Sequence, residues 1–115
     1  MDELSAVLVR KALDGLMMRQ NYIAQNLANA GTEGYVPARV TFENELQAVS
    51  TKGIESIRAV DPQVTYVNSD ALAAEMRIDL ELARASQTAM RYAALIDLRA
   101  RQTSLGMSVV QGGQR

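Results

Sequence analysis

Apolar residues recur through residues 3–30 at steps of three, four or seven, the spacing of one face of a helix. Asp2 and Glu3 stand at the start of this stretch, where the helix dipole favours negative charge. The pattern predicts one helix about 42 Å long, at 1.5 Å per residue. Other apolar residues lie off this stripe, so we expect the helix to be buried on several sides. The stripe consists of Leu4, Leu8, Ala12, Leu16, Ile23, Leu27 and Ala30.

A second helical pattern covers residues 71–111, with Asn68, Ser69 or Asp70 as candidate caps. Acidic residues lead this stretch and arginines follow, as the helix dipole prefers. A second apolar stripe runs beside the main one, so two such helices cannot cover each other as a hairpin. We therefore expect them to need neighbours from other chains. The main stripe consists of Leu72, Met76, Leu80, Ala83, Met90, Ala94, Leu98, Leu105 and Val109.

The middle of the chain, residues 36–70, holds both prolines and has a different pattern. Residues 41–49 predict two helical turns. Residues 53–60 and 64–67 are β-branched or alternating, which predicts a small hairpin around Asp61 and Pro62. The expected fold is mainly α, with two long terminal helices and a short irregular or β-containing insert. Its three parts are a helix with its following turn (1–35), the insert (36–70) and the second helix (71–115).

The stretch "NLANAGTEGY", residues 26–35, carries the features that end the first helix. Asn29 and Gly31 are residue types that tolerate the left-handed backbone of a helix C-cap. Gly34 permits a second sharp change of direction. Pro37 then forces Val36 into extended geometry, so the chain cannot resume the helix.

Two side chains of this stretch have further expected roles. Asn26 lies beside the apolar stripe, and a polar residue at a helix–helix seam can fix register and partner choice. Tyr35 can pack its ring on the helix end while its hydroxyl stays in water. On physical grounds alone, an ordinary helix end is the favoured explanation of the stretch. The sequence GTEG is no phosphate loop, because no strand precedes it and no lysine follows.

Composition excludes several classes of function. The formal net charge is −1, which argues against a nucleic-acid partner. No run of eighteen apolar residues is present, so no direct membrane span is expected. The N-terminus is acidic where a secretory signal is basic, so we expect no cleaved signal peptide.

Catalytic chemistry lacks its usual residues, because the chain contains no histidine and no cysteine. Two carboxylate pairs, Glu43 with Glu45 and Asp79 with Glu81, are two residues apart, so their members point away from each other on a helix. We expect them to lie on a solvated or salt-bridged surface. The sequence therefore predicts a protein that is not an enzyme, with no cofactor, metal site or small-molecule substrate.

The order of these motifs resembles that of bacterial flagellar rod and hook proteins. "IAQNLANAGTEGY" is similar to the "IANNLANANTPGY" signature that follows the first helix in that family. Gly31 stands where the family has Asn or Asp, and Glu33 stands where it has Pro. The expected assembly motif is Asn26, Leu27, Ala28, Asn29, Ala30, Gly31, Thr32, Gly34 and Tyr35.

Two further stretches resemble the proximal rod members of the family. "VPARVTFENEL" is similar to their continuation after the motif, and "ELARASQTAMRYAALIDLRARQTSL" is similar to their C-terminal helix, with Arg91, Tyr92, Ala94 and Leu95 in place. The likeness covers both ends of the chain, roughly 75 residues in all, and no resemblance is recognised for the rest of the middle. The residues expected to pack subunits together are Leu16, Ile23, Met90, Arg91, Tyr92, Leu95 and Leu98.

The resemblance implies a structural subunit of the flagellar basal body, exported unfolded through the flagellar export apparatus. Family members stack in a helical tube across the periplasm, with the terminal helices as an inner coiled-coil layer. The implied partners are further copies, other rod subunits, a rod–ring adaptor protein, the membrane (MS) ring and the export gate. A different rod subunit is an alternative. A cytosolic coiled-coil adaptor is another, although the broad stripes lack the regular charge pairs of strict heptads.

Overall fold

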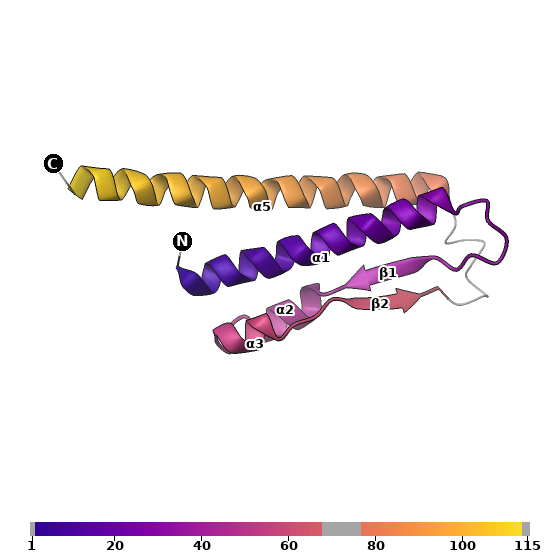
Figure 1. The fold of residues 1–115 in the computed structure, drawn as a ribbon, viewed down its shortest axis with the longest axis horizontal. Coiled ribbons are helices and arrows are strands. Elements are labelled where there is room, and N and C mark those ends of the chain that lie inside the picture. Colours follow the sequence, from indigo (N-terminus) through magenta and orange to yellow (C-terminus); the bar gives the residue numbers. More distant parts are fainter. Residues whose placement is uncertain (1, 68–76, 114–115) are drawn as a thin grey trace.

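Two long helices and a short insert make up the fold (Figure 1). A computed structural model of the chain describes residues 2–67 and 77–113, with side chains described as far as Ser104. The long helices are α1 (Glu3–Ala28) and α5 (Ile78–Gly113). The insert consists of β1 (Ala38–Thr41), α2 (Glu43–Val49), α3 (Ile54–Arg58) and β2 (Gln63–Tyr66). This architecture confirms the predicted mainly α fold with a β-containing insert. The prediction of a second helix over residues 71–111 is wrong at Arg77, which precedes the start of α5 at Ile78, and the expected start at residue 71 lies outside the described residues.

Helix α1 is the middle layer of the molecule. Figure 1 shows α5 along one side of it and the strands and short helices along the other. Asp2 caps its start, because the Asp2 carboxylate accepts a hydrogen bond of 2.7 Å from the Ser5 backbone N–H, which also lowers the pKa of Asp2. Residues on several faces of α1 are buried, as predicted, and the chain itself supplies the cover. They are Val7, Val9, Leu13, Leu16 and Ile23.

The predicted hairpin within the insert is wrong. Residues 54–58 form helix α3, and β2 pairs antiparallel with β1 instead, in a register that places Ala38 opposite Tyr66 and Val40 opposite Val64. The physical reason is the spacing of Ile54, Ile57 and Val60. Steps of three put these side chains on one face of a helical turn, and Ile57 is fully buried in the core. The predicted helical turns within residues 41–49 are confirmed as α2.

The hydrophobic core includes a close contact in which Phe42 packs against α1. The Phe42 ring is 4% exposed and lies over Gly15, and a Cβ atom at Gly15 would fall 2.5 Å from the ring atom Cδ1. The guanidinium of Arg19, one turn further along α1, lies 5.0 Å from the centre of the same ring. Glycine at position 15 therefore sets how closely the insert approaches α1.

Substitution Gly15→Ala is expected to lower the free energy of unfolding. Overpacking costs about 1–3 kcal/mol, and the better helix propensity of alanine returns at most about 1 kcal/mol. The measurement is thermal or urea unfolding followed by circular dichroism. Gly31→Ala is the matched control, since no atom lies within 4 Å of a Cβ there. Equal stability of the Gly15→Ala and wild-type proteins would contradict the close approach of Phe42.

Candidate functional site: a polar junction beneath the turn

The turn after α1 is built differently from the prediction. Asn29 ends the helix with φ −109° and ψ 16°, and the positive φ angles among the described residues occur at Gly34 and Gly53. The expected left-handed cap at Asn29 or Gly31 is therefore wrong. The Asn29 side chain closes the helix end instead, by donating to the Gln25 carbonyl at 2.9 Å. The sharp turn expected at Gly34 is confirmed by its φ of +79°.

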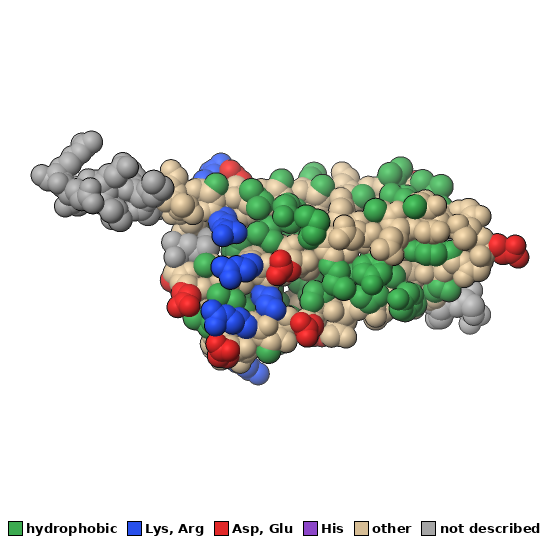
Figure 2. Space-filling view, in the orientation of Figure 1, with side chains coloured by type: hydrophobic (Ala, Val, Ile, Leu, Met, Phe, Trp, Pro, Cys, Tyr) green, Lys and Arg blue, Asp and Glu red, His purple; other side chains and the backbone are tan. Residues whose placement is uncertain are grey.

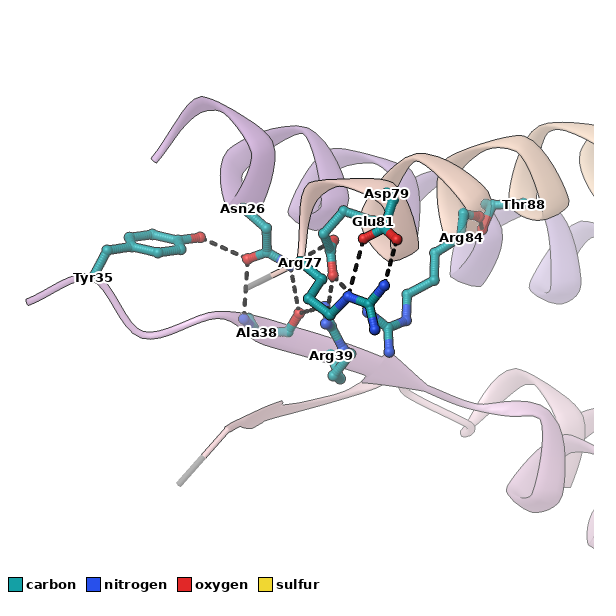
Figure 3. Close-up of polar contacts among 9 residues, drawn as sticks. All are labelled: Asn26, Tyr35, Ala38, Arg39, Arg77, Asp79, Glu81, Arg84 and Thr88. Atoms are coloured by element: carbon teal, nitrogen blue, oxygen red, sulfur yellow. Dashed lines mark hydrogen bonds and ion pairs between the residues drawn. The ribbon is translucent and has the colours of Figure 1, made fainter. Parts of the chain in front are cut away.

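Asn26 is the centre of the site. Its side chain is fully buried and makes four hydrogen bonds (Figure 3). The Nδ2 group donates to the Ala38 carbonyl at 3.0 Å and to Glu81 Oε2 at 3.3 Å. The Oδ1 atom accepts from the Tyr35 hydroxyl at 2.7 Å and from the Ala38 N–H at 3.1 Å. All the donor and acceptor capacity of the amide is used, so Asn26 joins α1, the turn, β1 and α5 at one point.

Tyr35 is held by this network, contrary to the expectation that its hydroxyl would stay in water. The hydroxyl donates to Asn26, and the ring is half-buried. Burial raises the pKa of Tyr35, and the negative charge of Glu81 raises it further. The hydroxyl therefore remains a hydrogen-bond donor at neutral pH.

Glu81 supplies the charge of the junction. The prediction of a surface carboxylate is wrong at this position, because the side chain is 1% exposed. Arg39 of β1 forms an ion pair with it, and Arg84, one turn further along α5, forms a second at 2.8 Å. The Thr88 hydroxyl, itself buried, donates to the Arg84 carbonyl at 2.8 Å on the next turn. A buried carboxylate is stable only when it is paired and hydrogen-bonded, which Asn26 and the two arginines provide.

Two further ion pairs lie outside the junction. Arg77 binds Asp79 at the start of α5, and this hydrogen bonding lowers the pKa of Asp79. Arg19 binds Glu43 through two contacts of 2.6 Å, and the hydrogen bonds from Arg19 lower the pKa of Glu43. The Glu43 pair therefore contributes stability at neutral pH that is lost as the pH falls through the lowered pKa.

The residues expected in the assembly motif differ in exposure: one is buried, and the other eight are exposed or half-buried. Asn26 is buried, Leu27 and Ala30 are half-buried, and Ala28 is exposed. The Thr32 hydroxyl donates to Asn29 Oδ1 at 3.2 Å, which braces the turn.

The residues expected to pack subunits together divide into two groups. Five are covered wholly or partly by their own chain or take part in its ion pairs, and two have large exposed surfaces. Met90 is 67% exposed and Leu98 is 43% exposed. The first group comprises Leu16 and Ile23 (buried), Tyr92 and Leu95 (half-buried against the core), and Arg91, whose guanidinium lies 3.6 Å from Glu43.

Sequence reasoning missed Glu81, Arg39 and Arg84. The spacing of Glu81 and Arg84 is that of an intrahelical pair, and Arg39 is flanked by the buried Ala38 and Val40. These signals predict an ion pair and a strand, but the burial of Glu81 depends on Asn26, 55 residues earlier in the chain.

No chemistry beyond hydrogen bonding and ion pairing is evident at the junction. Among residues 2–67 and 77–113, no three carboxylates, histidines or cysteines are grouped so as to hold a metal ion. The described helices include none with the length and apolarity needed to cross a membrane. The arrangement positions segments of the chain against one another.

The fold and its junction define a mainly helical protein of two long helices, locked together through a turn and a short insert. No family model matches the chain. Over 45 residues it is 44% identical to a protein of Borrelia hermsii named "Flagellar basal body rod protein FlgB". The matched segment covers 39% of this chain and 33% of the length of that relative.

Substitution Asn26→Asp tests the junction. It replaces the Nδ2 donor with a carboxylate oxygen beside Glu81 and the Ala38 carbonyl, so we expect a loss of at least about 2 kcal/mol in the free energy of unfolding at neutral pH. Two adjacent buried carboxylates raise the pKa of one of them. The loss should therefore shrink as the pH falls from about 8 to about 5.

The measurement is urea unfolding across this pH range. The control is Gln25→Glu, the same amide-to-acid change at the exposed neighbouring residue, for which we expect a change within about 0.5 kcal/mol. An Asn26→Asp protein as stable as the control at every pH would show that the junction does not hold the fold.

Proposed function

We propose that the protein is a structural subunit of the flagellar basal-body rod, the shaft that crosses the periplasm and transmits motor torque. The similarity to a protein named as a flagellar rod protein supports this function. We further propose that it belongs to the proximal segment, beside the membrane ring and the export gate. The motif after α1 and the "MRYAALIDL" stretch of α5 support that choice.

The exposed apolar surface of α5 is the structural observation that supports a role in assembly. Helix α5 is covered by α1 along one side, and large apolar side chains remain exposed on its other faces. Figure 2 shows hydrophobic side chains gathered toward the strand end of the molecule, while charged side chains gather toward the end that carries α2 and α3. The exposed apolar residues of α5 are Ile78, Leu80, Leu82, Met90, Ile96 and Leu98.

Each part of the chain has a role in the proposed rod. Residues 1–35 and 71–115 contribute the long helices of an inner coiled-coil layer, and the insert of residues 36–70 faces outward. The described elements of the insert, β1 to β2, lie along the side of α1 away from α5. The partners in the proposal are further copies, other rod subunits, a rod–ring adaptor, the MS ring and the export gate. In this proposal the protein acts without catalysis, cofactor or metal, and it reaches the periplasm through the flagellar export apparatus.

Deletion of the gene in its flagellated host is the direct test of this function. We expect basal bodies without rods and non-motile cells, with both restored by a plasmid copy. Rods of normal number and length in the deletion strain would overturn the proposal. A motility defect with complete rods would point to the alternative, a cytosolic coiled-coil adaptor.

Substitution Leu98→Asp is expected to abolish rod assembly while leaving the monomer intact. The side chain is 43% exposed in the single chain, so a charge there meets water in the monomer and an apolar neighbour in the assembly. The measurements are basal-body yield by electron microscopy and thermal unfolding of the purified variant. Arg99→Ala, at the next and exposed position, is expected to be tolerated. Normal rods with Leu98→Asp, or lost rods with Arg99→Ala, would show that the buried face of α5 has been misassigned.

A further inference from the structure

A charged cleft of about 290 Å³ lies between α1, β1 and α5. Four arginines line it, and Ile23, Ala38 and Val40 contribute its apolar surface. The arginines come from all three elements: Arg19 from α1, Arg39 from β1, and Arg84 and Arg91 from α5. No part of the proposed function accounts for this concentration of guanidinium groups.

Within the chain, two carboxylates face the four arginines. Glu43 binds Arg19 closely, and Glu81 binds Arg39 and Arg84. Arg91 is the most exposed of the four, with 52% of its side chain accessible, and its guanidinium approaches Glu43 only to 3.6 Å. Arg91 therefore has donors available to a further carboxylate.

The rest of the chain has the opposite balance of charge. The whole sequence carries 12 Lys and Arg against 13 Asp and Glu. With the four arginines of the cleft and the two glutamates that pair with them set aside, eight basic residues remain against eleven acidic ones. A second copy of this chain is therefore electrostatically complementary to the cleft.

The surface beside the cleft is apolar, so an occupant that covers both must also carry apolar side chains. A shallow hollow on α5 shares Arg84 and Gln87 with the cleft and is otherwise lined mainly by Leu80, Ala83 and Met90. The occupant that fits both surfaces carries a carboxylate with apolar side chains next to it.

One segment of the chain matches this description best. Among the described residues, three acidic residues have an exposed large apolar side chain on each side, and two of these, Asp79 and Asp97, are themselves exposed, whereas Glu81 is buried. Asp79 is already bound through two contacts to Arg77 and lies next to Leu80 of the hollow itself. Asp97 makes one contact, from its Oδ2 to Arg101 at 2.9 Å, and lies between Ile96 and Leu98, each 43% exposed.

A helical neighbour can lie along this part of α5. Positions on the cleft side of the helix recur at alternating steps of four and three, which is the spacing of a seam between two helices. All of them are exposed or half-buried in the single chain. They are Leu80, Arg84, Gln87, Arg91, Ala94, Leu98 and Arg101.

We propose that the cleft receives Asp97 from α5 of a second copy, with Arg91 as its ion-pair partner and Ile96 packed in the hollow beside it. The inference rests on the self-association contained in the proposed function and names one contact of it. Each copy carries both the cleft and Asp97, on different parts of its surface. The contact is therefore heterologous and repeats from one copy to the next.

Cysteine cross-linking of the full chain tests the contact, because the sequence contains no cysteine. In the variant Arg91→Cys/Asp97→Cys the two positions are six residues, or about 9 Å, apart along α5, beyond the reach of a disulfide within one chain. We expect mild oxidation to give a ladder of dimers, trimers and longer species on a non-reducing gel. The single variants Arg91→Cys and Asp97→Cys should each give disulfide-linked species no larger than dimers. Arg91→Cys/Asp14→Cys, which uses an exposed acid of α1, should also give no ladder.

A charge exchange provides the second measurement. The variants Arg91→Asp and Asp97→Arg should each weaken self-association, measured by sedimentation velocity, by about tenfold or more, and the double variant should restore it to within about threefold. Circular dichroism checks that all three remain folded. Absence of the ladder, or a double variant no better than the single ones, would overturn the proposed contact. Loss of rods in the deletion strain would then still support the proposed function, so the two can fail separately.

Discussion

The buried pairing of Asn26 with Glu81 is the interaction on which the arrangement of the chain depends. Asn26 lies near the end of α1, and Glu81 lies one turn into α5. A buried carboxylate without partners costs several kcal/mol, so Glu81 fixes where Arg39 and Arg84 must lie. Because the remaining bonds of Asn26 go to Tyr35 and Ala38, one amide side chain holds the turn, the first strand and the second long helix.

This junction explains why α1 is covered on two sides by its own chain, whereas α5 is covered on one side only. Helix α1 is covered on one side by the insert, through Phe42 over Gly15, and on the other by α5. Helix α5 has α1 along one side, so residues such as Met90 and Leu98 stay exposed. The single chain is therefore folded but has one exposed apolar surface, on α5. We propose that neighbouring subunits cover this surface when the rod assembles.

The sequence alone was sufficient to predict the two long helices, because the periodic spacing of apolar residues in a helix depends only on local geometry. It was also sufficient for the turn at Gly34, where a positive φ favours glycine. The strand pairing was missed, since spacing cannot show that Ile57 would be drawn into a core formed by distant residues. The burial of Glu81 was missed for the same reason, because its partner Asn26 is far away in the chain. A carboxylate two residues from another acidic residue, Asp79, is typical of a solvent-exposed helix surface.

We propose that the junction holds the first part of α5 to its own chain and leaves the following part exposed for contact with a neighbouring subunit. Hydrogen–deuterium exchange on the monomer and on assembled material measures this directly, segment by segment. In the monomer we expect amides of residues 81–92 to be protected about as strongly as those of residues 13–26, while residues 96–104 exchange much faster and become protected only on assembly. Uniform protection along α5 in the monomer, or fast exchange at residues 81–92, would contradict the account.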